Sequence, residues 1–142
     1  KRTGQPVDLN LLLIRVARAH RTMAASLLSQ VGLHPGQEAL LIELWERDGR
    51  TQADLADALG VQPPTVTKML QRMESSGLVD RRPDALDGRA IRVHLTPKGR
   101  RLKGKVDKLW RQLRDRTVDG LSDRQQASLA SLLGQLEANL SR

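Results

Sequence analysis

Residues 51–73 read TQADLADALGVQPPTVTKMLQRM, and this stretch decides the fold. Thr51 followed by Asp54 is typical of the capping box that begins a helix, and Gly60 is a residue type that commonly ends one. The Pro63-Pro64 pair suits the first turn of a following helix, where a missing backbone N–H costs least. The stretch therefore predicts a short helix, a turn and a second helix, which is the helix-turn-helix arrangement.

The second of these helices runs to about Ser76 and has two different faces. Its apolar residues recur at helical spacing and predict a side packed against a core. The other side gathers hydrogen-bonding and cationic residues, namely Thr65, Lys68 and Arg72, with Gln62 at the entry. A helix laid in the major groove of duplex DNA needs this mixture. An ordinary surface helix carries similar residues, so this helix alone leaves both interpretations open.

A basic β-hairpin follows. Ile91, Val93 and Leu95 alternate with polar residues, which is the period of a strand, and Asp87-Gly88 predicts the turn. We expect Arg89, at the tip, to reach a narrow minor groove. The alternative is that Arg89 only pairs with a neighbouring acid, Asp84 or Asp87. A basic hairpin directly behind such a helix is typical of a wing, and the two together favour DNA binding.

Longer amphipathic helices flank this unit. Helical spacing predicts a helix from Asp8 to about Val31 and another from Pro35-Gly36 to Asp48-Gly49. Thr96-Pro97 begins a long helix, and Ser122 with Gln125 forms a capping box for the last one. The fold class is therefore mainly α (α+β), a winged helix-turn-helix with long N- and C-terminal helices. The apolar faces of these end helices must pack on each other, on the middle unit or on a second chain.

Composition narrows the function. The chain has 142 residues, a net charge of +8, no Cys, Phe or Tyr, and two aromatic residues, both Trp. Lack of Cys excludes disulfides, thiol catalysis and Cys-based zinc sites, and few aromatics count against single-strand binding by base stacking.

Residues 61–101 carry nine basic and four acidic side chains, which places the largest positive excess at the recognition helix and wing. We find no Gly-rich phosphate loop or catalytic pairing, so we expect no enzyme, cofactor or metal. Without a membrane-spanning run or leader, we expect a cytoplasmic protein.

Three groups of residues carry a resemblance to a known family. They are Gly32-Leu33 with Gln37 and Thr51 to Ala56; Pro64 to Leu70 with Met73-Glu74 and Gly77 to Val79; and Asp84, Asp87 to Arg89, Val93 to Thr96 and Gly99. In this order and spacing, the run from Leu33 to Gly99 resembles the winged helix of the MarR (multiple antibiotic resistance regulator) family. The resemblance implies a DNA-binding domain over 33–99 and a helical dimerisation region over 1–32 and 100–142. It also implies a homodimeric regulator, in most cases a repressor, on a palindromic operator.

The resemblance assigns contacts to individual residues. Those expected at base edges are Gln62, Pro64, Thr65 and Lys68; those expected at phosphates are Thr67, Arg72, Arg81, Arg82 and Arg92; and Arg89 enters the minor groove. The chain departs from the family at Gln62, where many members have Ser, and at Pro63-Pro64, which removes two backbone donors. Its missing cysteines set aside the peroxide-sensing branch, and its three histidines are scattered along the sequence rather than clustered as in metal sensors.

Many relatives release DNA when a small phenolic or aromatic anion binds. By this resemblance Arg18 and Arg21, with Gln37 nearby, could hold its carboxylate, although we favour the alternative that both arginines are solvated or paired with acids. A rival function is an effector-independent architectural DNA-binding dimer or an interaction subunit. Binding to a specific sequence would favour the regulator, and binding that depends on duplex length would favour the architectural protein.

Overall fold

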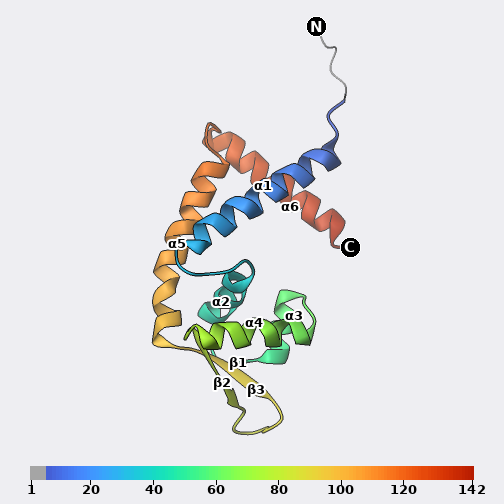
Figure 1. Ribbon diagram of the computed structural model, residues 1–142. Helices are drawn as coiled ribbons and strands as arrows, with labels where there is room; N and C mark the ends of the chain where they lie inside the picture. Colours follow the sequence, from blue (N-terminus) through green and yellow to red (C-terminus); the bar gives the residue numbers. More distant parts are fainter. Residues whose placement is uncertain (1–5) are drawn as a thin grey trace.

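The computed structural model describes residues 6–142, which form six helices and one three-stranded antiparallel sheet (Figure 1). In chain order the elements are α1 (Leu9–Ser29), α2 (Gln37–Glu46), β1 (Arg50–Thr51), α3 (Gln52–Leu59), α4 (Pro63–Ser75), β2 (Val79–Pro83), β3 (Ile91–Leu95), α5 (Pro97–Thr117) and α6 (Asp123–Leu140). The predicted winged helix-turn-helix with long end helices is confirmed. The first five residues of the predicted region 1–32 lie outside the described part of the chain.

Side-chain caps begin the helices at the predicted places. The Thr51 hydroxyl accepts the backbone N–H of Asp54 at 3.1 Å, and Thr96 caps α5 in the same way. At the start of α6, Ser122 and Gln125 each accept the other's backbone N–H, which completes the capping box. Each cap satisfies a helical donor that would otherwise lack a partner, so local sequence sets these boundaries.

The sheet holds the wing against the helices. The strand order is β1-β3-β2, with Arg50 opposite Val93 and Val79 opposite Leu95. The strand β1 was not predicted, because two residues are too few to show an alternating pattern. It gives β3 a partner on both sides and ties the wing to the segment that leads into α3.

The connection between β2 and β3 is longer than the two-residue turn that Asp87-Gly88 favours. It comprises residues 84–90, closed by the Asp84 N–H on the Ala90 carbonyl at 2.9 Å and the Ala90 N–H on the Asp87 carbonyl at 3.0 Å. Gly88 is not among the glycines with positive φ, which a type I′ turn would need at this place. The turn is where it was predicted, at the end of a wider loop.

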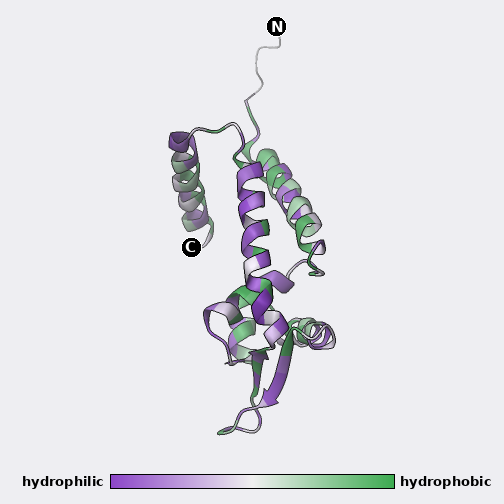
Figure 2. Cartoon of the chain, turned by 90° about the vertical axis from the view of Figure 1, so that its left-hand side faces the viewer, coloured by the Kyte–Doolittle hydropathy of each residue, from purple (hydrophilic) through white to green (hydrophobic). Residues whose placement is uncertain are grey.

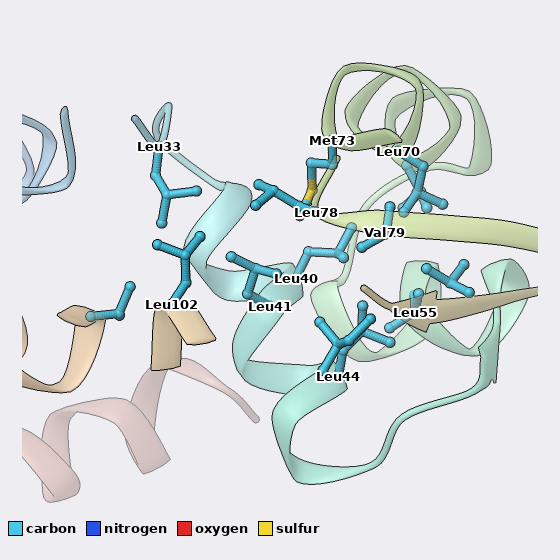
Figure 3. Packing of buried hydrophobic residues seen from close by; sticks show 14 of the residues in the cluster. Leu33, Leu40, Leu41, Leu44, Leu55, Leu70, Met73, Leu78, Val79 and Leu102 are labelled. Carbon is cyan, nitrogen blue, oxygen red and sulfur yellow. The ribbon is translucent and has the colours of Figure 1, made fainter. Parts of the chain in front are cut away.

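Leucines from α2 form the centre of the core (Figure 3). Leu40, Leu41 and Leu44 have no exposed surface, and they pack with Leu55 of α3 and with apolar residues of α4 and the sheet. The first turns of α5 belong to the same cluster through side chains such as Leu102. The predicted boundary between residues 99 and 100 therefore falls inside α5, a helix that is packed into the winged unit.

The end helices leave large apolar surfaces uncovered. α1 packs along α5, but most of its apolar side chains are exposed, with Leu9 71% exposed. α6 has no buried residue and stands to one side of α5 (Figure 2). The apolar faces that the sequence predicts to be buried are thus exposed to solvent in the single chain.

None of the helices in the described residues has the length and apolar character that a membrane span needs.

Candidate nucleic-acid interface

The helix α4 presents the two predicted faces. Val66 and Leu70 are fully buried, whereas Thr65, Lys68 and Arg72 are exposed. In the view of Figure 1, α4 and the wing lie at the end of the molecule away from α6. The exposed face therefore belongs to a rigid helix held by the core, as specific groove contacts require.

The N-terminal end of α4 offers an uncommitted amide. Gln62 is the N-cap residue, but its side chain makes no capping hydrogen bond, and both it and Pro64 are exposed. The Gln62 side chain therefore keeps a donor and an acceptor for an external partner. An amide of this kind can pair with adenine in the major groove.

Thr67 has a different environment from Thr65. It is half-buried, and its hydroxyl donates to the Pro63 carbonyl at 3.1 Å and accepts from the Gln52 amide at 3.4 Å. The contact with Gln52 joins α4 to α3. Thr67 thus has structural partners of its own beside the phosphate contact predicted for it.

Arg81, at the base of the wing, is held by an acid from α4. Its guanidinium lies 3.2 Å from Glu74 and 3.5 Å from the Gln52 side-chain oxygen, and its backbone N–H donates to Glu74 at 3.3 Å. The side-chain hydrogen bond from Arg81 is the largest influence on the pKa of Glu74, which lies below its usual value. Arg81 therefore links the wing, α3 and α4.

Arg92 ties the wing to the loop before β1. Its Nε lies 2.9 Å from Asp84, and its Nη1 donates to the Gly49 carbonyl at 2.7 Å. The pKa of Asp84 is lowered first by the backbone N–H of Leu86 and then by Arg92. The guanidinium predicted for phosphates is thus occupied by partners within the chain.

The wing tip leaves Arg89 available. Its backbone N–H donates to the Asp87 carboxylate at 3.0 Å, while Arg92 takes the Asp84 carboxylate. In the described part of the chain no acid lies within ion-pair distance of the Arg89 guanidinium. The Arg82 side chain is 62% exposed and lies 3.7 Å from Asp80. A long ion pair at the surface contributes little to stability, so it does not hold Arg82 away from DNA.

The charge is distributed differently from the prediction. Residues 33–96 carry eight basic and ten acidic side chains, whereas α5 carries nine basic and two acidic ones. The excess counted over residues 61–101 came in large part from Lys98, Arg100 and Arg101, which begin α5. The expectation that the recognition helix and wing hold the largest excess is wrong.

Several contacts that hold the candidate DNA-binding side chains in place were not predicted from the sequence. Gln52, Glu74 and Asp84 hold the predicted DNA-contacting side chains in place, and Gly49 does so through its carbonyl. The paired residues lie between seven positions apart, for Glu74 and Arg81, and 43 positions apart, for Gly49 and Arg92. No local spacing rule connects them.

The three residues proposed for an anionic effector are not brought together in the single chain. Gln37 is 5% exposed and accepts the His34 N–H at 3.1 Å. It borders a hollow of about 220 Å³ whose other lining residues come from the α2 entry and α4, including Lys68 and Arg72. Arg18 and Arg21 do not line that hollow and are exposed on α1.

Known proteins resemble this chain both in sequence and in structure. The MarR family model matches residues 33–91. The HTH-type transcriptional regulator TtmR of Methylorubrum extorquens (strain PA1) is 36% identical over 138 residues, which cover 94% of this chain and 71% of that protein. A mutant of E. coli MarR complexed with operator DNA has a TM-score of 0.80 at 26% identity, covering 90% of this chain and 92% of that one. A probable transcriptional regulator from Pseudomonas aeruginosa has the same score and identity, with coverages of 91% and 96%. The chain therefore belongs to the MarR family and is a transcriptional regulator with a winged-helix DNA-binding fold, not an enzyme.

Proposed function

We propose that this chain is a repressor that acts in the cytoplasm and binds a palindromic operator as a homodimer. The exposed face of α4 carries the proposal, since Thr65, Lys68 and the free Gln62 amide lie together on a helix held rigidly by the core. Each α4 would lie in a major groove, and each Arg89 would enter the flanking minor groove. Operator DNA in the complex of the E. coli relative supports the same class of partner.

The uncovered apolar faces support a second copy of this chain as the partner. Leu132 is 63% and Leu133 49% exposed on α6, and Leu12 and Leu13 are more than two-fifths exposed on α1. Contiguous apolar surfaces of this kind are typical of obligate interfaces. A dimer with two-fold symmetry would place two recognition helices about one duplex turn, roughly 34–36 Å, apart.

The cations of the interface divide into two groups under this proposal. Lys68, Arg72, Arg82 and Arg89 are exposed and available to DNA. Arg81 and Arg92 are engaged within the chain, so we assign them the positioning of α4 and the wing, with any phosphate contact secondary. Specific contacts depend on such preorganised supports.

Selection from a random duplex pool tests the function. We expect the purified protein to enrich a palindrome whose half-sites are about one helical turn apart, and its affinity to fall steeply with salt as counterions are released. Enrichment without a palindrome would contradict the proposal. Equal binding to all sequences, with affinity set by duplex length, would favour the architectural alternative.

We further propose that a small aromatic carboxylate releases the operator. The hollow beside Gln37 is bordered by Lys68 and Arg72, so an anion held there would compete with DNA for the same cations. A titration with small phenolic acids against the bound operator tests this step. Unchanged operator binding at the highest soluble concentration of the phenolic acids would exclude release by such an effector, and the proposed repressor function would still stand.

A further inference from the structure

The largest concentration of positive charge lies on α5, outside the recognition helix and the wing. This helix has a net charge of +7, against +8 for the whole chain. Its buried stripe, which includes Leu102 and Val106, packs on the rest of the chain. Figure 2 looks onto α5, which is hydrophilic along most of its length, with α1 and α6 on either side.

Four cations form an exposed stripe on this helix. Arg101, Lys105, Lys108 and Arg111 follow one another at intervals of four, three and three residues, which places them on one face away from the buried stripe. In the described part of the chain none of the four has an acid within ion-pair distance. With a rise of 1.5 Å per residue, the stripe extends over about 15 Å.

Polar contacts join the N-terminal end of α5 to α4 and to the loop before β1. The Lys98 ammonium donates to the carbonyl of Ser76, the C-cap residue of α4, at 2.8 Å, and Arg100 pairs with Asp48 at 3.3 Å. A polyanion held by α4 and the wing therefore lies at the same end of the molecule as the start of the stripe. A second copy is a poor occupant, because two stripes of like charge would repel each other.

We infer that the stripe is a second duplex contact, which binds the phosphate backbone of DNA flanking the operator. The inference rests on the proposed function and adds a contact that does not read sequence. Duplex DNA carries about one charge per 1.7 Å, so four cations over about 15 Å can each meet a phosphate once the flank bends toward α5. Flanking DNA would then increase affinity without any change in the operator.

The test compares two duplexes that contain the selected operator, one with the half-sites only and one with about 20 extra base pairs on each side. We expect the wild-type protein to bind the longer duplex more tightly, by roughly tenfold or more. The variant Lys105→Gln/Lys108→Gln should lose that advantage and keep its affinity for the short duplex. Its log–log salt slope on the long duplex should fall by about 3 to 4 for a dimer.

The matched control is Arg124→Gln/Arg142→Gln, which removes the same charge from exposed positions of α6 and its C-terminal end. We expect it to keep the advantage of the long duplex. Equal affinity of the wild type for both duplexes, or an equal loss in the control, would overturn the second contact while operator binding stands. Failure of the wild type on the short operator would instead refute the proposed function, and with it this inference.

Discussion

The guanidinium of Arg92 lies 2.9 Å from the carboxylate of Asp84, across the base of the loop that carries Arg89. The same guanidinium donates to the Gly49 carbonyl outside the wing. Arg92 therefore closes the loop and fixes it to the neighbouring segment. This loop carries Arg89, the side chain that we propose enters the minor groove, so we expect the closure to position it.

We expect Arg92→Gln to weaken operator binding by about tenfold, because the loop loses its closure. If Arg92 acts by positioning Arg89, the effects of Arg92→Gln and Arg89→Ala will not add in a double-mutant cycle, and the salt slope will stay close to that of the wild type. Additive losses, with the slope reduced by about 0.9 per protomer, would show that Arg92 contacts phosphate itself. Fluorescence anisotropy over a salt series measures both quantities.

The pair also predicts how the wing responds to acid. The pKa of Asp84 in the folded protein lies below its ordinary value, so its contribution to stability is present above the unfolded pKa of about 3.9 and is lost as the pH falls through the lower, folded value. We expect Asp84→Asn to lower the melting temperature between pH 5 and 8 and to approach the wild type below about pH 4. A difference in melting temperature that stays constant from pH 8 down through the folded pKa of Asp84 would contradict an ionised carboxylate held by the Leu86 N–H and Arg92.

Arg89→Ala tests the wing tip directly. The exposed guanidinium has no acid beside it in the described residues, so its removal should not disturb the fold. We expect a loss of about 1–3 kcal/mol of operator binding, the usual range for a specific base contact. Arg124→Ala, on α6, is the control for general charge and should bind as the wild type does. Unchanged affinity of Arg89→Ala in a gel shift would remove the wing from the interface.

Local chemistry made the elements predictable, and long-range pairing limited the prediction of the site. Thr51 and the Ser122-Gln125 box begin helices through contacts within three residues, which a sequence displays directly. Arg92 reaches the Gly49 carbonyl only in the folded chain, because β1 must pair with β3 before Gly49 lies beside Arg92. The partners of Arg92 therefore cannot be read from local sequence. Charge alone cannot tell a cation that is free for DNA from one held by an acid.

At Gly99, near the start of α5, the surrounding atoms leave no room for a side chain larger than hydrogen. A Cβ at Gly99 would collide with the Leu78 carbonyl oxygen, and the Gly99 carbonyl accepts the Trp45 indole N–H at 3.0 Å. We expect Gly99→Ala to destabilise the protein by about 1–3 kcal/mol, as overpacking does. Gly104→Ala in the same helix meets nothing within 4 Å and should stabilise by about 0.5–1 kcal/mol. Urea unfolding measures both, and equal effects of the two changes would refute the close approach of Gly99 to Leu78.

Leu133→Asp tests the assembly. This side chain is 49% exposed in the single chain, on the apolar face of a helix with no buried residue, so we place it in the proposed contact with a second copy. Burial of an unpaired carboxylate in that contact should raise the dimer dissociation constant by at least about 100-fold. Ser131→Asp places the same charge on the opposite face of α6 and should leave the dimer intact. Sedimentation velocity measures the assembly, and circular dichroism confirms that the helices persist. A dimer that survives Leu133→Asp, or one weakened equally by Ser131→Asp, would exclude α6 from the interface and with it the proposed spacing of the two recognition helices.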